Sequence, residues 1–178
     1  MELQKRKPTR LKDYDYSQNG AYFITICVKD RKQLLSTIVG DDALIVPNTN
    51  SPHHYTIESD AHIRPQNKLS EIGLLCDKYI NNINIKYDDI MVDKYVIMPN
   101  HIHLIISIHG TMRASSPTRG VVDVIRSLKT MVTREIGYPI WQCSYHDHII
   151  RGENDYQKIW EYIDTNVVKW KDDCFYSE

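Results

Sequence analysis

The sequence lacks any apolar run long enough to cross a membrane, and no apolar signal core follows its basic N-terminus. Its four cysteines include no Cys-x-x-Cys pair, which argues against a zinc knuckle. The wide spacing of these cysteines, together with the missing export signal, favours reduced thiols over a disulfide framework. We therefore expect a cytoplasmic protein without a membrane partner.

The sequence also lacks an overall excess of positive charge. Its 22 lysines and arginines face 23 acidic residues, giving a formal net charge of −1. This balance argues against a strong nonspecific DNA-binding protein, which is normally basic. The positive charge is nevertheless uneven, because residues 1–19 form a basic N-terminal arm. A second basic stretch contains Arg113, Arg119, Arg126, Lys129 and Arg134.

The order of expected elements predicts one α+β domain over residues 1–178. Alternating apolar residues and short runs of β-branched residues predict strands. Apolar residues at helical spacing predict helices, the last with a capping box from Asn154 to Gln157. Strands are expected at 20–29, 36–39, 90–98 and 101–108, and an extended piece at 141–151. Helices are expected at 70–84, at 121–136 and from about 154. Flexible loops are expected at 40–67, with a small hairpin near 55–58, and at 109–120. Strands interspersed with so few helices favour a ferredoxin-like antiparallel sheet with helices packed on it.

His101 and His103 are the most informative residues, because they lie two positions apart in an apolar, β-branched run. Side chains two apart on a strand share a face, so both imidazoles project side by side while Ile102 points into a core. Such a pair can hold one divalent metal ion. The alternative is a pair of hydrogen-bonded core residues, although burying both without partners is costly.

Tyr162 is off the buried stripe of the last expected helix, about 115° from its centre at 100° per residue. Asn166 follows it by one turn and Lys158 precedes it by one turn, on the same side. These residues can form a polar site, but spacing alone favours an ordinary amphipathic edge, where a tyrosine hydroxyl stays hydrated.

Several sequence blocks together resemble the single-tyrosine HUH transposases, in particular the REP-associated tyrosine transposases (U is a bulky apolar residue). The resemblance covers most of residues 20–170, and the MPNHxH and WQ…R blocks are specific in combination. The blocks are, in chain order, 22–27 (YFITIC), 96–103 (VIMPNHIH), 127–129 (SLK), 140–151 (IWQ…YHDHIIR) and 162–169 (YI…NVVK). Two departures are Asn166-Val167-Val168, where the family usually has Asn-Pro-Val, and the long 40–67 loop.

This resemblance implies a fold, an activity and a set of site residues. It implies the HUH nuclease fold, with His101 and His103 as metal ligands and Tyr162 as the nucleophile. Asn166 matches the polar residue that completes metal coordination, and Arg151 matches a basic residue that contacts DNA phosphate. We expect further DNA contacts on the basic stretch and near the site. These are Lys129, Lys158, Arg126 and, by stacking on a flipped base, Trp141, which is equally well placed in the core.

The implied activity is a metal-dependent transposase or endonuclease that cleaves and rejoins single-stranded DNA, with REP-like hairpins as its substrate and a nucleoid-associated location. Only ~0.1% of a free tyrosine is phenolate at pH 7, so the nucleophile needs help. A Mg²⁺ or Mn²⁺ ion would polarise the phosphate, and imidazole and amide ligands suit Mn²⁺ well. Whether one chain or a homodimer builds the site stays open at this point.

Three alternatives remain from the sequence. A domesticated, non-catalytic hairpin-binding protein is the first. A metal-dependent hydrolase is the second, although no Asp or Glu lies within the histidine motif to serve as general base. The third is a second metal site at another His-x-His pair, His146 and His148, although a hydrogen-bonding network is the favoured role of these two residues. Tyr145 and Tyr156 are the next candidates for the nucleophile.

Overall fold

The computed structural model describes residues 14–40, 65–110 and 120–176. Most of the basic arm, most of the two predicted loops and the hairpin expected near 55–58 fall outside these residues. Within the described parts of the chain, no helix combines the length and apolar composition that a membrane-spanning segment needs.

A four-stranded antiparallel sheet with the strand order β4-β5-β1-β6 forms the centre of the molecule. The strands are β1 (Gly20–Cys27), β4 (Ile90–Ile97), β5 (His101–Ile108) and β6 (His146–Ile150); the helices are α1 (Glu71–Lys86), α2 (Val121–Ile136) and α3 (Glu153–Thr165). Helix α1 connects β1 to β4, and α2 connects β5 to β6, which gives the βαββαβ order of a ferredoxin-like fold. The predicted α+β class is confirmed.

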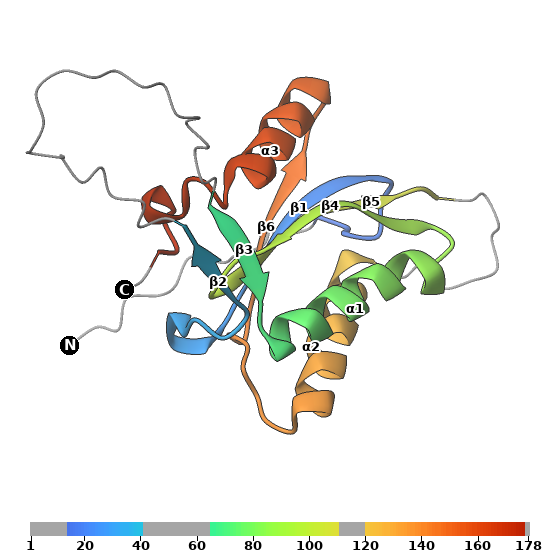
Figure 1. Cartoon of the computed structure of the whole chain (residues 1–178). Coiled ribbons are helices and arrows are strands. Elements are labelled where there is room, and N and C mark those ends of the chain that lie inside the picture. Colours follow the sequence, from blue (N-terminus) through green and yellow to red (C-terminus); the bar gives the residue numbers. More distant parts are fainter. Residues whose placement is uncertain (1–13, 41–64, 111–119, 177–178) are drawn as a thin grey trace, which may run out of the picture.

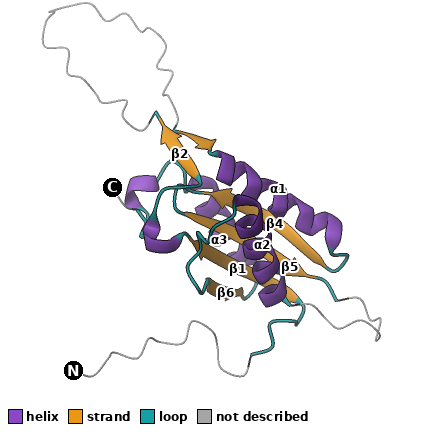
Figure 2. Cartoon of the chain, turned by 90° about the horizontal axis from the view of Figure 1, so that it is seen from below, coloured by secondary structure: helices purple, strands orange, loops and turns teal. Residues whose placement is uncertain are grey.

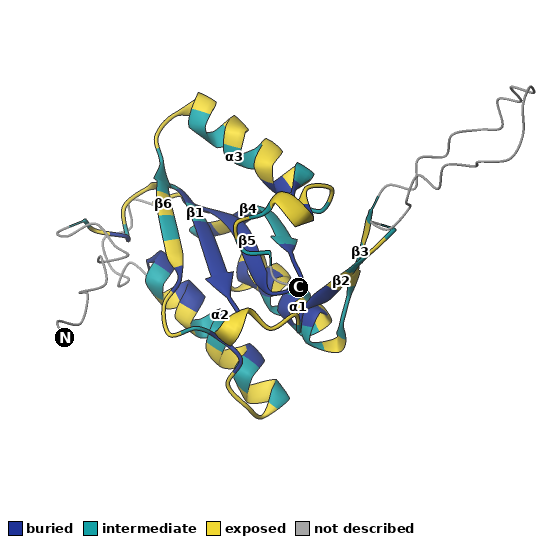
Figure 3. Cartoon of the chain, turned by 90° about the vertical axis from the view of Figure 1, so that its left-hand side faces the viewer, coloured by how far each residue is buried: buried dark blue, intermediate teal, exposed yellow. Residues whose placement is uncertain are grey.

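The sheet lies between two helical layers (Figure 1). Helices α1 and α2 lie side by side across one face (Figure 2), where Ile24 and Ile26 of β1 and Ile102 of β5 are fully buried. Helix α3 packs on the opposite face, against β4 and β5 (Figure 3). Because side chains alternate along a strand, the residues on either side of Ile102 face α3.

A separate two-stranded sheet pairs β2 (Ser36–Val39) with β3 (Gln66–Leu69). The prediction missed β3, which overlaps the end of the expected loop and whose sequence, QNKL, carries little apolar alternation. The chain then enters α1 at Ser70, whose hydroxyl accepts a hydrogen bond from the Gly73 N–H. A Cβ on Gly73 would lie 2.0 Å from the Leu35 carbonyl oxygen, so this close approach requires glycine.

Helix boundaries agree with the sequence pattern to within two residues, but the cap predicted at the start of α3 does not form. Helix α2 spans the predicted residues and ends at Gly137, which adopts a left-handed conformation. The capping box predicted at Asn154 is wrong, because α3 begins at Glu153 and is preceded by Gly152 with a φ of 97°. Gln157 instead donates to the Glu153 carboxylate.

Candidate active site

The paired histidines stand at the beginning of β5, immediately after a tight turn. The Met98 N–H donates to the His101 carbonyl at 2.8 Å, so Pro99 and Asn100 form the tip of the β4–β5 hairpin. The hairpin therefore fixes the position of both rings on the face that α3 covers. Both are fully buried, and their Nε2 atoms lie 2.9 Å apart.

Asn100 sets the protonation pattern of the His101 ring. Its amide nitrogen donates to the carbonyls of Arg31 and Phe175, so its oxygen is the atom that faces His101 Nδ1, at 2.8 Å. Nδ1 of the neutral ring must therefore carry the proton, and Nε2 presents a lone pair to the site. An outer hydrogen bond of this kind is how a metal-binding histidine is usually oriented.

Thr25 supports the second imidazole. It is the cross-strand partner of His103 on β1, and its hydroxyl lies 2.8 Å from His103 Nδ1. A hydroxyl can either donate or accept, so Thr25 is compatible with both neutral forms of the ring. Phe23, two residues earlier, stacks on the same imidazole with the ring centroids 5.1 Å apart.

Tyr162 reaches this pair from the third turn of α3. Its hydroxyl lies 3.2 Å from His103 Nε2, and the residue remains 38% exposed. Two contacts hold α3 against β4. Lys94 of β4 forms an ion pair with Asp164 of α3, and the Tyr156 hydroxyl of α3 donates a 3.0 Å hydrogen bond to Asp93 of β4. The structure therefore brings the predicted nucleophile and the predicted ligands together within a single chain.

Asp173 is a fourth member of the site that the sequence did not reveal. It lies just after a short 3-10 turn, η2 (Trp170–Asp172), and its side chain is only 1% exposed. Its Oδ2 accepts hydrogen bonds from the Tyr162 hydroxyl at 3.0 Å and the Asn166 amide at 2.8 Å. In sequence Asp173 sits among charged residues, a pattern that is typical of an exposed segment.

Burial dominates the electrostatics of the site. It lowers the pKa of His101 to about 4, against the opposing effect of the Asp173 carboxylate. Burial, followed by the neighbouring His101, lowers the pKa of His103 well below its usual value. Both rings are therefore neutral near pH 7, the form that binds metals. Burial, followed by the Asp173 charge, raises the pKa of Tyr162, so its phenol is protonated.

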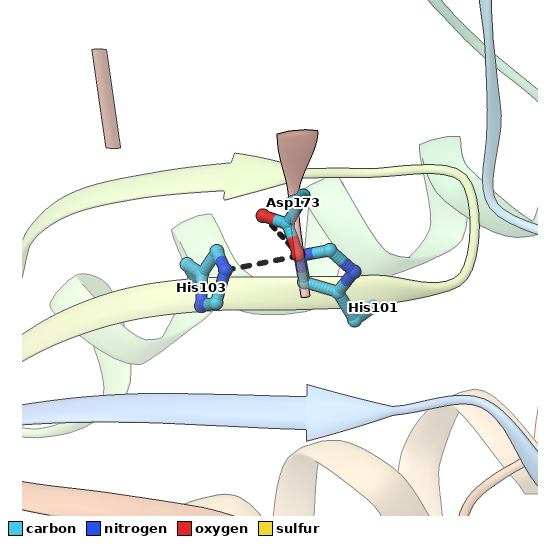
Figure 4. A group of neighbouring side chains, drawn as sticks. All are labelled: His101, His103 and Asp173. Atoms are coloured by element: carbon cyan, nitrogen blue, oxygen red, sulfur yellow. Dashed lines mark hydrogen bonds and ion pairs between the residues drawn. The ribbon is translucent and has the colours of Figure 1, made fainter. Parts of the chain in front are cut away.

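The donor atoms fit a divalent metal ion. His101, His103 and Asp173 each offer one ligand atom, and these atoms all lie within 4.8 Å of one another (Figure 4). Asn166, 3% exposed, lies one turn beyond Tyr162, and its side-chain oxygen is buried without a hydrogen-bond partner. A buried acceptor without a partner is costly, and a bound cation would satisfy it.

The predicted DNA-contacting residues lie in two different places. Arg151 and Lys158 are exposed at the end of β6 and on α3, in the same layer as Tyr162. Arg126 is on α2, across the sheet, where it pairs with Asp123 at 2.9 Å. Lys129 donates to the Gln142 carbonyl at 2.6 Å, and Trp141 is 9% exposed with its N–H bonded to the Lys129 carbonyl. Trp141 therefore takes the core position that the sequence left open, and DNA contact by the other four residues stays a prediction.

The second His-x-His pair does not form a metal site in the described residues, where the one group of three or more potential ligands is His101, His103 and Asp173. His148 instead lies 2.9 Å from Asp155, which also accepts a hydrogen bond from the Arg151 N–H. His148 therefore belongs to a hydrogen-bonding network of the kind that the sequence favoured, whereas the His146 ring lies 6.2 Å from that of Phe175.

The fold is similar to that of a solved transposase structure. The structure of a REP-associated tyrosine transposase bound to a REP hairpin superimposes with a TM-score of 0.58, at 20% sequence identity, covering 90% of this chain and 74% of the other. The chain has the fold of a REP-associated tyrosine transposase. This fold agrees with the resemblance of the sequence blocks. A proposed transposase from Deinococcus radiodurans is more distant, with a TM-score of 0.45, 15% identity and coverage of 88% of this chain and 95% of the other.

Sequence comparison gives fewer relatives. No protein-family model matches the chain. An uncharacterised protein from Haemophilus influenzae is 29% identical over 195 aligned positions, which cover 98% of this chain and 94% of that protein.

Proposed function

We propose that this chain is a transposase that cleaves and rejoins single-stranded DNA through Tyr162, with His101, His103 and Asn166 holding a Mg²⁺ or Mn²⁺ ion. The observation that carries the proposal is the 3.2 Å separation between the Tyr162 hydroxyl and His103 Nε2. A nucleophile and a metal ligand at this distance can act on one phosphate group.

In the proposed reaction, the Tyr162 oxygen attacks the scissile phosphorus. A bond forms between that oxygen and the phosphorus, and the bond from phosphorus to the 3′ oxygen breaks. The phenol gives up its proton and the departing 3′ oxygen takes up a proton, so no net proton is released. The products are a 5′-phosphotyrosine link and a free 3′-OH. Attack by another 3′-OH reverses the step and rejoins DNA without ATP, because the link retains the bond energy. The metal ion, when bound, supplies charge stabilisation on the phosphate oxygens.

The chain's own residues prepare this step. Asn100 holds the His101 imidazole in the neutral form that presents Nε2 to the site, and the Thr25 hydroxyl orients the His103 ring. The α3 anchors at Asp93 and Lys94 place Tyr162 beside them. Tyr162 remains 38% exposed, so a DNA strand can approach its side chain. A hairpin substrate and contact by Arg151 and Lys158 belong to the same proposal, supported by the fold of the hairpin-bound neighbour.

A covalent adduct tests the proposal. Hairpin oligonucleotides drawn from a library of single-stranded sequences are labelled at either end and incubated with Mn²⁺, then separated on a denaturing gel. A label at the 3′ end should become linked to protein, whereas a label at the 5′ end should appear on a shortened, free strand. Tyr162→Phe should bind DNA nearly as well as the wild type and yield no adduct. Wild-type cleavage by that variant would disprove the assignment.

A metal-dependent hydrolase is the second candidate, and Asp173 favours it. The sequence offered no general base near the histidines, but the fold places this carboxylate 4.0 Å from His101 Nε2. In that case both labels would appear on shortened, free strands and no adduct would form. A non-catalytic hairpin-binding protein would bind the oligonucleotides and leave both labels on full-length DNA.

A further inference from the structure

The segment that carries Asp173, residues 170–176, lies directly over the histidine pair. The Phe175 ring packs on His101 with centroids 4.7 Å apart, and Trp170 lies 5.9 Å from the same imidazole. The Phe175 carbonyl accepts a hydrogen bond from the Asn100 amide at 2.8 Å. Arg31 donates to the Cys174 carbonyl at 3.1 Å. These contacts fix the segment, and Asp173 with it, against the beginning of β5.

Neutral donors surround the Asp173 carboxylate. Its Oδ1 accepts the Phe175 N–H at 2.7 Å, and its Oδ2 accepts the Tyr162 hydroxyl and the Asn166 amide. The His101 imidazole lies 4.0 Å from Oδ2. The hydrogen bonds to this buried carboxylate come from uncharged groups, and a cation at this position would offset the cost of burying its charge.

Two of the three donor separations match those of a coordination shell, and all three lie within 4.8 Å. The Nε2 atoms of His101 and His103 are 2.9 Å apart, and Asp173 Oδ2 is 4.0 Å from His101 Nε2. Around an octahedral ion with ligands at about 2.1 Å, adjacent donors lie about 3.0 Å apart and opposite donors about 4.2 Å. Figure 4 shows the two rings projecting from β5 and the carboxylate approaching them from the other segment.

We propose that Asp173 is a protein ligand of the same divalent ion, beside His101, His103 and Asn166. This inference rests on the proposed function for the identity of the site. The carboxylate adds a hard oxygen donor, which suits Mg²⁺ and Mn²⁺, and cancels half of the ion's charge inside a buried site. Residues 170–176 are then part of the metal centre, and metal binding stabilises their docked position.

Metal affinity without DNA tests the assignment. Mn²⁺ is titrated into the full chain, and the free ion is followed by its electron paramagnetic resonance signal. Asp173→Asn, which keeps the size of the side chain, should weaken Mn²⁺ binding on the order of 10- to 100-fold. Asp172→Asn is the matched control, because Asp172 is the exposed neighbour, and it should bind Mn²⁺ as the wild type does. His101→Ala should lose the site.

Hydrogen exchange gives a second, independent readout. Saturating Mn²⁺ should slow amide exchange across residues 170–176 in the wild type and in Asp172→Asn, but not in Asp173→Asn. Circular dichroism and a thermal melt establish that each variant is folded before its affinity is compared.

Some outcomes would overturn the assignment. Wild-type Mn²⁺ affinity in Asp173→Asn, with loss of binding in His101→Ala, would exclude Asp173 as a ligand. If Asp173→Asn, with wild-type Mn²⁺ affinity, also cleaved DNA faster than the wild type, residues 170–176 would act as a cover over the site. Wild-type affinity in His101→Ala would place the ion elsewhere. By contrast, weakened Mn²⁺ binding by Asp173→Asn, together with no covalent adduct in the wild type, would support the ligand and refute only the proposed transesterification.

Discussion

The Tyr162 hydroxyl and the His103 Nε2 atom lie 3.2 Å apart within one chain, although 59 positions separate the two residues in sequence. This contact depends on α3 packing across β4 and β5 of its own sheet. The two halves of the candidate site therefore meet within one chain of this structure, whereas the sequence left both a monomer and a shared dimeric site open.

A complementation experiment tests assembly in cis. Tyr162→Phe and His103→Ala each remove one half of the site, and we expect an equimolar mixture of the two to form no more covalent DNA adduct than either alone. If α3 were exchanged between two chains, some mixed dimers would contain one complete site. Adduct formation that appears only in the mixture would therefore contradict the structure.

Thr25 should tune metal affinity through His103. Thr25→Val preserves the shape of the side chain but removes the hydroxyl that lies 2.8 Å from Nδ1. Loss of such an outer hydrogen bond should weaken Mn²⁺ binding by about 10-fold. Thr25→Ser retains the hydroxyl and is the control. Equal Mn²⁺ affinities for the Val and Ser variants, measured by titration, would remove Thr25 from the metal site.

The buried histidines should make stability depend on pH when EDTA removes metal ions. The folded pKa values of both lie below 6.5, so the unfolded chain binds more protons in acid and unfolding becomes easier. The free energy of unfolding should be unaffected by these residues above pH 6.5. It should fall by up to about 1.4 kcal/mol per pH unit through His101 between pH 6.5 and about 4, and His103 should add to this fall below pH 6.5.

Urea unfolding at several pH values measures this slope. The double variant His101→Gln, His103→Gln should show a shallower dependence between pH 6.5 and 4 than the wild type. An unchanged slope would mean that neither imidazole is neutral in the folded, metal-free protein.

Tyr156 should act on the position of α3 and not on the chemistry. Its hydroxyl donates to Asp93 at 3.0 Å, and burial with the Asp93 carboxylate raises its pKa to about 12. Tyr156→Phe should destabilise the fold by about 1 kcal/mol and slow adduct formation without abolishing it. Complete loss of adduct in a folded Tyr156→Phe variant, with adduct retained in Tyr162→Phe, would reverse the two roles.

Arg151 should contribute one phosphate contact to DNA binding. Arg151→Ala should weaken binding about equally for all hairpin sequences and reduce the slope of log affinity against log salt by about one. Arg134→Ala, at the exposed end of α2, is the control outside the predicted contacts. Fluorescence anisotropy at several salt concentrations measures both slopes, and identical slopes for wild type and Arg151→Ala would remove this contact.

Local patterns in the sequence predicted the elements where side-chain periodicity is strong. The strand with its two histidines and helix α2 occupy the residues expected. Burial on both sides of β5 gives a continuous apolar run, and burial of one stripe of α2 gives a clear helical period. The short strand β3 was missed because its polar residues carry little such pattern.

Contacts between segments that are distant in sequence could not be predicted from local sequence patterns. The alternation of β1 places Thr25 on a face of the sheet, but only the pairing register places it opposite His103. Asn100 was part of the recognised block, yet its support of His101 depends on the Arg31 and Phe175 carbonyls. Asp173 gave no signal, since its burial results from the docking of residues 170–176.

Mass spectrometry of the trapped complex tests the central proposal most directly. After cleavage of a hairpin in Mn²⁺, the protein is digested with nuclease and trypsin, which separates peptide 159–169, with Tyr162 as its single tyrosine, from the Tyr156 peptide 152–158. We predict a nucleotide joined through a 5′-phosphate to Tyr162. A nucleotide on another tyrosine, or cleavage of the hairpin without any modified peptide, would contradict the assignment of Tyr162 as the nucleophile.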